Sequence, residues 1–462
     1  MHLTISKPQI CRLFPVFFLL ITVFQPAVAQ TAAQPEREQL LNGLRLLLWS
    51  RPGSQDLLVK LRIHSGAAFD LAGKSGQMSL LGDLLFPDRA TVEYFTEEMD
   101  GRLDVTVNYD SLTITMQGKA SELERIIELL RNALIATQLT PEIVTRMREA
   151  RIKIIRDTAI STPTIADRAV AARLFGDYPY GRPSSGSVED LSRVDRADLM
   201  LARNRFINSN NATLALVGGV TKSRAMRALR QLLGPWRKSE QIVPTTFRLP
   251  AAPDQRVLII NGATDAPELR LAVRGVARRD PDYYAAKVLA KMVQHRWEAQ
   301  LPQLAKRPTF ARSDSYFLPG IFTIGAAVEY QSVGEAINTA KKVIDSIAAG
   351  PVTPSEMDRA RSEVILELTA MSARPDAVAD SLLDADTYRL TANDEPVLVV
   401  NNLTPADIQR LATRLFKGAP VATVVIGDTT QLKTALQGRV QFEVFGELAP
   451  PPPKLANPPV KP

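Results

Sequence analysis

Two kinds of hydrophobic periodicity follow one another along the chain. Apolar and polar residues alternate in Leu57–Ile63, Leu103–Asn108 and Leu112–Gln117, which is typical of half-buried strands. Apolar residues recur at helical spacing in Met78–Phe86 and Glu122–Leu134. The last two of the three strands are separated by a connection of hairpin length. The pattern therefore predicts a fold that mixes helices with antiparallel strands.

Several segments recur about 210 residues further along the chain, in the same order. The similar pairs are Leu57–Ile63 with Leu269–Val273, Ala212–Gly218 with Ala422–Gly427, and the helix start Thr140-Pro141-Glu142 with Thr353-Pro354-Ser355-Glu356. Such a repeat indicates an internal duplication. We expect an α+β protein of two homologous α/β-sandwich domains, each a mainly antiparallel sheet with helices on one face.

Proline-containing stretches mark the boundaries of these domains. Residues 241–252 are expected to link an N-terminal domain, 30–240, to a C-terminal domain, 253–448. Residues 449–462 contain seven prolines and are expected to form an extended, solvated tail.

The first 29 residues have the pattern of a secretory signal peptide. Lys7 and Arg12 precede the apolar run Leu13–Phe24, and Ala27-Val28-Ala29 forms a small-residue cleavage site. The run is too short to span a hydrocarbon layer of about 30 Å, although an uncleaved anchor is the alternative. Cys11, the only cysteine, lies in this leader. We therefore expect a periplasmic or secreted protein, cut after Ala29, with no integral membrane segment and no disulfide.

Composition excludes several classes of function. The chain of 462 residues is 45% hydrophobic and 23% charged, as in an ordinary globular protein, and its net charge of +7 is too dilute to indicate nucleic-acid binding. Of three histidines, His2 lies in the leader, so only His64 and His295 remain. A zinc site built from several histidines is thereby excluded.

Six segments together resemble the insulinase/pitrilysin-type metallopeptidases, especially the short two-domain members related to mitochondrial processing peptidase. The most specific is Asp177-Tyr-Pro-Tyr-Gly-Arg-Pro183 followed by Gly186, and the others are Leu61–Gly66, Gly76–Phe86, Met99–Val107, Asn211–Val220 and Pro319–Ile324. The resemblance extends over about residues 35–445. It implies that the two domains enclose a chamber between them.

The family's chemistry depends on a His-x-x-Glu-His helix, in which the histidines bind zinc and the Glu activates water. The resemblance places Ser79-Leu80-Leu81-Gly82-Asp83 at these positions, and it places the last zinc ligand, a Glu, near Arg156. Ser79, Gly82, Asp83 and Arg156 cannot bind zinc and activate water as the family residues do. The resemblance therefore implies a degenerate member with no catalytic residues, no metal and no cofactor.

A second family feature is an Arg/Tyr pair that holds the substrate from the second domain. The resemblance places this pair near Pro302 and Phe310, which cannot replace it. Arg307, Arg312 and Tyr316 are close in sequence and are possible substrate contacts. Whether the chain keeps this half of the site is left open by the sequence.

Three functions are compatible with these features. The first is a non-catalytic subunit that pairs with a zinc-bearing homologue as a heterodimer and confines unfolded peptides for proteolysis. The second is a stand-alone periplasmic peptide-binding or scaffold protein. The third is an active zinc endopeptidase with an atypical site, which the missing histidines disfavour.

Overall fold

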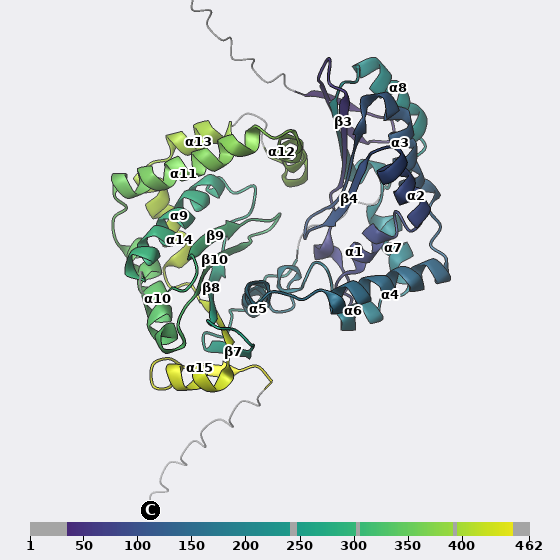
Figure 1. Ribbon diagram of the computed structural model, residues 1–462. Helices are drawn as coiled ribbons and strands as arrows, with labels where there is room; N and C mark the ends of the chain where they lie inside the picture. The colour runs from purple at the N-terminus through teal and green to yellow at the C-terminus, as the bar shows by residue number, and fades with distance from the viewer. Residues whose placement is uncertain (1–34, 241–246, 302–304, 391–394, 447–462) are drawn as a thin grey trace, which may run out of the picture. The chain divides into compact units, whose positions relative to one another are not determined.

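Two six-stranded sheets organise the chain (Figure 1). The computed structural model describes residues 35–240, 247–301, 305–390 and 395–446. The predicted signal peptide 1–29, the tail 449–462 and the first six residues of the linker 241–252 lie outside these ranges. Within them, no helix combines the length and the apolar character needed to cross a membrane.

The first half contains the strands of one sheet and eight helices among the described residues. The strands are β1 (Glu36–Gln39), β2 (Arg45–Ser50), β3 (Asp56–Ile63), β4 (Arg102–Val107), β5 (Leu112–Lys119) and β6 (Ala212–Gly218). The helices are α1 (Gln77–Asp83), α2 (Arg89–Glu93), α3 (Leu123–Arg131), α4 (Pro141–Asp157), α5 (Thr162–Phe175), α6 (Val188–Ser192), α7 (Arg196–Phe206) and α8 (Lys222–Leu233).

The second half repeats this plan with the other sheet. Its strands are β7 (Val257–Asn261), β8 (Glu268–Arg274), β9 (Phe310–Asp314), β10 (Ile321–Ala327), β11 (Ala422–Gly427) and β12 (Phe442–Val444). Its helices are α9 (Tyr283–Gln300), α10 (Val333–Ala349), α11 (Pro354–Ser372), α12 (Pro375–Tyr388), α13 (Pro396–Asn402), α14 (Pro405–Phe416) and α15 (Thr429–Leu436).

The strand orders of the two sheets correspond one to one. The first is β1-β2-β6-β3-β5-β4 and the second β12-β7-β11-β8-β10-β9, so only the edge strands β1 and β12 differ. Four of five pairings in the first sheet and three of five in the second are antiparallel. The predicted duplication and the mainly antiparallel sheets are confirmed.

Equivalent helices begin in the same way in both halves. Thr140 caps α4 by accepting a hydrogen bond from the backbone N–H of Ile143, and Pro141 follows as the first helical residue. Thr353 caps α11 through the N–H of Glu356, again with a proline at the first helical position. These are the helix starts that the repeat predicts.

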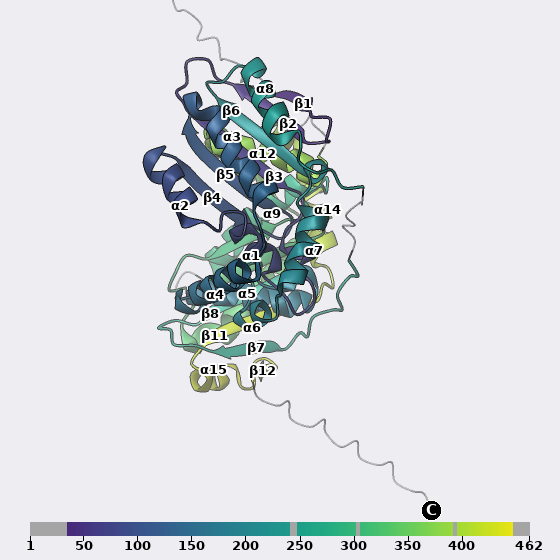
Figure 2. The same cartoon turned by 90° about the vertical axis from the view of Figure 1, so that its right-hand side faces the viewer.

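Each sheet has a main core on one face because successive side chains of a strand point to opposite faces. In β6, Leu214 and Leu216 join the core of the first half, whereas Ala215 and Val217 point the other way. In Figure 2 helices α3 and α8 lie over β5 and β6 on the core side. The second half has an equivalent core with α9, α10, α11 and α14.

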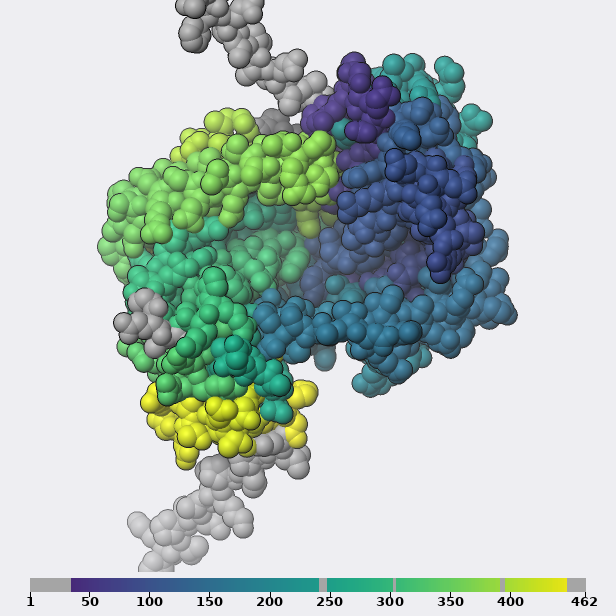
Figure 3. Space-filling model, viewed as in Figure 1, coloured from purple at the N-terminus to yellow at the C-terminus, as the bar shows by residue number. Residues whose placement is uncertain are grey.

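The opposite face of each sheet is partly covered by a helix of the other half, which the sequence analysis does not predict. Helix α12 of the second half packs Ala379 and Leu383 against Ala215 and Val217 of the first sheet. Helix α5 of the first half packs on β8 and β11 of the second sheet. Figure 3 shows the light green surface of α12 meeting the blue and purple surface of the first half. Each half therefore contributes one helix to the sheet of the other half. We call α5 and α12 the exchanged helices.

Buried ion pairs fix both exchanged helices. On the first sheet, Lys60 Nζ lies 2.6 Å from the Asp380 carboxylate of α12, and Arg62 Nη2 lies 2.7 Å from the same group. On the second sheet, Arg270 Nε lies 2.6 Å from the Asp167 carboxylate of α5. Lys60 and Arg270 are both buried. Each half thus presents a strand-borne cation to a helix-borne Asp of the other half.

A third polar contact joins the β4–β5 hairpin to the second half. The Asp110 carboxylate accepts hydrogen bonds from the backbone N–H of Phe317 at 2.9 Å and from the Tyr180 hydroxyl at 3.2 Å. Burial raises the pKa of Asp110 to about 6, against the lowering effect of these hydrogen bonds. Asp110 is thus a buried carboxyl whose partners come from two parts of the chain.

Candidate functional site

Helix α1 carries Ser79, Gly82 and Asp83, to which the sequence resemblance assigns the family's first zinc ligands and general base. It begins after Gly76, whose φ of 90° is left-handed, and the backbone N–H groups of Gly76 and Met78 donate to the Asp70 carboxylate at 2.7 and 2.8 Å. Burial raises the pKa of Asp70 to about 7 despite these bonds. Asp70 therefore fixes the start of a largely buried helix.

The segment after the Tyr-Pro-Tyr-Gly motif packs directly on this helix. A Cβ on Gly76 would lie 2.6 Å from the Cα of Gly186, so the two glycines allow the backbones to meet. The Ser79 hydroxyl donates to the carbonyl oxygen of Ser184 at 2.8 Å. Because Ser79 is buried and uses its hydroxyl in this bond, it serves as a structural link between α1 and the motif segment.

Gly82, at the position of the family's general base, faces apolar strand residues. A Cβ there would lie 3.3 to 3.5 Å from side-chain carbons of Val105, Val107 and Leu112. A carboxylate at this position would meet the apolar surface of β4 and β5. The local packing therefore suits glycine and gives no support for a catalytic base.

Asp83, at the position of the second histidine, is held by a cation. Arg151 Nη1 of α4 donates to the Asp83 carboxylate at 2.5 Å, and Arg151 Nε donates to the Ser185 carbonyl at 3.4 Å. Burial raises the pKa of Asp83, while the Arg151 guanidinium opposes that rise. The single carboxylate of this site is thus neutralised by an arginine.

The residue of α4 that contacts Asp83 is Arg151, five residues before Arg156, and the assignment of Arg156 to the last ligand position stays a prediction. Arg156 is exposed. An α-helix turns about 100° per residue, so five residues rotate a side chain about 140° away from the face that Arg151 occupies. The sequence analysis assigned the position by distance along the chain, which leaves the helix face undetermined.

These residues do not fit zinc. A zinc site needs three or four His, Cys, Asp or Glu ligands, and the only such side chain at the motif positions is Asp83, which already pairs with Arg151. Within the described ranges, no three His, Cys, Asp or Glu side chains gather where they could hold a metal. These positions therefore lack the ligand set that a zinc-dependent reaction needs.

Neither described histidine lies near α1. His64 directly follows β3 and is half-buried, and its ring nitrogens lie 3.0 Å from the hydroxyls of Thr387 and Thr213. Burial, with the nearby arginines, lowers the pKa of His64 to about 3, so the ring is neutral. His295 of α9 pairs with Glu363 of α11 at 3.0 Å. Both histidines make contacts that hold the fold.

The three residues of the second half that the sequence offers as substrate contacts, Arg307, Arg312 and Tyr316, each bind different neighbours. Arg307 pairs with Asp265 at 2.8 Å and also with Glu268. Arg312 pairs with Asp314 at 2.8 Å and with Asp167 of α5 at 3.0 Å. Pro302 lies outside the described residues, and a substrate-binding role for the three stays a prediction.

Tyr316 lies in an aromatic cluster between the two halves. Its ring centroid is 4.6 Å from that of Tyr180 and 5.1 Å from that of Tyr109, both in the first half. The Tyr180 hydroxyl also accepts a hydrogen bond from the backbone N–H of Leu318 at 3.1 Å. The Tyr-Pro-Tyr-Gly motif thus contacts the second half through its second tyrosine, Tyr180. The segment that follows the motif contacts α1.

The duplicated fold is that of a two-domain peptidase shell. A crystal structure of a peptidase M16 inactive domain from Pseudomonas fluorescens matches it with a TM-score of 0.74 at 17% identity, over 86% of this chain and 98% of that chain. Residues 193–364 match the family model described as "Peptidase M16 inactive domain".

Curated relatives agree with this match over nearly their whole length. An uncharacterized zinc protease of Mycobacterium tuberculosis is 22% identical, over 85% of this chain and 93% of the relative. A probable mitochondrial-processing peptidase subunit beta of Schizosaccharomyces pombe is 19% identical, over 86% and 93%. The chain is similar over most of its length to insulinase/pitrilysin-type (M16) peptidases, and the resemblance seen in its sequence is confirmed.

Proposed function

We propose that this chain is a non-catalytic member of the family that pairs with a zinc-bearing homologue. The observation that carries the proposal is the Asp83–Arg151 ion pair, which puts a guanidinium against the single carboxylate at the motif positions. A cation there repels a second cation, so the altered site disfavours a metal as well as lacking its ligands. Catalysis, in this account, belongs to the partner.

The preserved shell supports a role in assembly. The segment after the Tyr-Pro-Tyr-Gly motif packs on α1, and Tyr180 of the motif contacts the second half, so the altered positions stand in an ordered framework. The fission yeast relative is itself named as a subunit. A second shell facing the partner's zinc would complete a chamber that confines an unfolded peptide, which raises the rate through orientation.

We further propose that the chain works outside the cytoplasm. This proposal rests on the leader, with Lys7, Arg12, the run Leu13–Phe24 and a cut after Ala29. The cysteine-free remainder suits a bacterial periplasm, where a large core takes the place of disulfides. The partner would then be exported as well.

Co-expression with a homologue from the same organism that has an intact His-x-x-Glu-His motif tests the pairing. We expect one complex on gel filtration, with an interface above about 1,000 Å², and a higher peptidase rate than the partner has alone. The matched control is the same mixture with the partner's motif Glu changed to Gln, which should assemble and remain inactive. If neither a complex nor a change in rate is found, pairing is rejected and the stand-alone peptide binder replaces it.

A further inference from the structure

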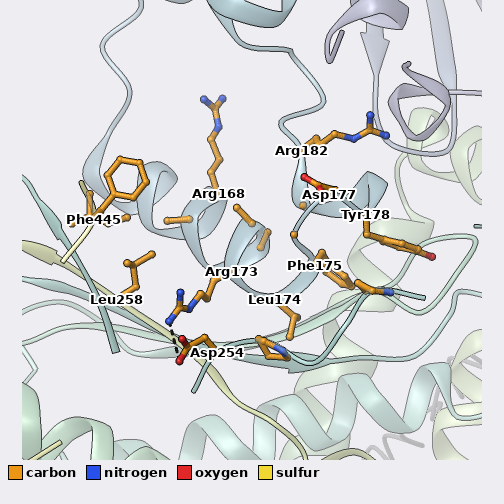
Figure 4. Close-up of a pocket in the computed structure, with 18 of the residues that line it drawn as sticks. Arg168, Arg173, Leu174, Phe175, Asp177, Tyr178, Arg182, Asp254, Leu258 and Phe445 are labelled. Carbon is orange, nitrogen blue, oxygen red and sulfur yellow. Dashed lines mark ion pairs between the residues drawn. The ribbon is translucent and has the colours of Figure 1, made fainter. Parts of the chain in front are cut away.

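A large groove lies beside the exchanged helix α5, away from α1 and the altered motif. Its volume is about 1720 Å³, and its walls come from α5 and the segment that follows it, from residues 247–256, and from strands β7 and β12 (Figure 4). No residue of α1 lines it.

The groove exists because α5 is too narrow to cover the sheet face it packs on. Neighbouring strands are about 4.8 Å apart and a helix is about 10 Å wide, so one helix covers about two strands. Helix α5 packs on β8 and β11. Leu258 and Ile260 of β7, the next strand, are left as the partly buried floor.

Ion pairs hold the walls together. Arg173 of α5 bonds to Glu443 of β12 and lies 3.5 Å from Asp254, the contact dashed in Figure 4. Arg256 closes the same cluster at 2.5 Å from both Asp254 and Glu443. The groove is therefore a built feature of the fold, since four charged groups from three segments fix its sides.

Its inner surface is aromatic and apolar. Phe175, Phe247 and Phe442 line it, and Leu249 and Phe445 at its rim are 69% and 72% exposed. Large apolar side chains exposed together mark a surface that binds something. Aromatic grooves of this kind take extended proline-rich segments, whose fixed backbone lowers the entropy lost on binding.

The chain carries such a segment at the edge of this groove. The described residues end at Gly446, which lines the groove, and the sequence then continues for 16 residues with seven prolines. The φ of Gly446 is +84°, a left-handed conformation that glycine adopts readily. At about 3.1 Å per residue, the 16 residues reach about 50 Å. The tail is long enough to return along the groove.

Charges at the rim complement those of the tail. Asp177 and Arg168 both line the groove, and neither forms an ion pair within the described ranges. The tail carries Lys454 and Lys461. Asp177 can therefore receive a tail lysine.

We propose that the groove binds the chain's own proline-rich C-terminal segment, residues 447–462. Docking the tail would cover Leu249 and Phe445 and join α5, β7 and β12 under one strap. This inference does not depend on the proposed function, because it concerns one chain without a partner.

Cysteine cross-linking in the full mature chain tests the proposal, since no other cysteine is present after the leader. The test variant combines Leu249→Cys with Leu455→Cys, and a short bismaleimide joins thiols that lie close together. The matched control combines Leu366→Cys with Leu455→Cys, because Leu366 on α11 is 71% exposed but does not line the groove.

We expect the test variant to give at least about tenfold more intramolecular product than the control, as a tethered, docked segment requires. Changing Pro450, Pro451, Pro452 and Pro453 to Ser in the test variant should lower its yield toward that of the control. Equal yields at the two positions, no product at either, or an unchanged yield after the proline changes would overturn the proposal. Products that join two chains would instead assign the groove to the tail of a second copy.

Discussion

Asp83 and Arg151 lie 2.5 Å apart on helices α1 and α4. The two side chains are mostly shielded from solvent, at 32% and 18% exposure. The pair therefore forms an internal charge contact that helps to join the two helices, at the position to which the sequence resemblance assigns a zinc ligand.

Changing Arg151 to Met should destabilise the chain by about 1–3 kcal/mol, because Asp83 then loses its cation in a largely desolvated place. Urea unfolding followed by circular dichroism measures this. The matched control is Arg156→Met on the same helix, which should change the free energy of unfolding by no more than about 0.5 kcal/mol. Equal losses in the two variants would refute the assignment of Arg151.

Restoring one ligand should not restore metal binding. The Ser79→His variant should hold no zinc, since one imidazole beside the Asp83–Arg151 pair is short of a ligand set. A variant with Ser79→His, Asp83→His and Arg151→Glu has two histidines one helical turn apart and a carboxylate from α4, and it should bind about one zinc per chain. Elemental analysis after dialysis checks both, and zinc in the single variant would contradict the account.

The exchanged helices should each contribute measurably to stability. Asp167→Asn and Asp380→Asn remove the carboxylates that pair with the buried cations Arg270 and Lys60. Each should lower the free energy of unfolding by about 1–2 kcal/mol, because Lys60 loses its carboxylate partner and Arg270 is left with Glu268 alone. Asp376→Asn, at the start of α12, removes a carboxylate that pairs with the exposed Arg374; this control should cost about 0.5 kcal/mol or less. If the control matches the test variants, the ion pairs do not fix the helices.

The titration of Asp110 should lower the free energy of unfolding as the pH rises from about 4 to about 6. Its pKa in the folded chain is about 6, above the ordinary value of 3.8, so the folded state binds the proton more tightly than the unfolded state does. This contribution is present in full below the ordinary pKa and is lost above the folded one, and it is on the order of 2–3 kcal/mol.

Asp110→Asn tests this by removing the titration while keeping an acceptor. Other buried groups also titrate in this range, and His64, whose lowered pKa has the opposite effect, is one of them. The comparison of the two proteins isolates Asp110. Thermal unfolding between pH 4 and 6.5 should show a smaller fall for the variant, and parallel curves would contradict the prediction.

Local patterns predicted much of this fold. The alternation in Leu103–Asn108 and Leu112–Gln117 matches β4 and β5, and the repeated segments Ala212–Gly218 and Ala422–Gly427 are the equivalent strands β6 and β11. The starts of α4 and α11 follow from Thr-Pro signals that act within one helical turn. These features depend on neighbouring residues, so a single sequence contains the information for them.

Contacts between distant segments could not be predicted in this way. The burial of α5 and α12 on the opposite half depends on packing between residues far apart in the chain. Arg151 and Arg156 belong to one basic stretch, and only the rotation of α4 against α1 decides which of them meets Asp83. The groove beside α5 is missed for the same reason, since its walls come from three separate segments.

The zinc content of the purified pair tests the central claim most directly. Elemental analysis of this chain together with its zinc-bearing homologue should give about one zinc per pair, and this chain alone should hold none and cleave no peptide, because its motif positions lack the ligands. Two zinc ions per pair, or about one zinc in this chain alone together with peptide cleavage, would contradict the account.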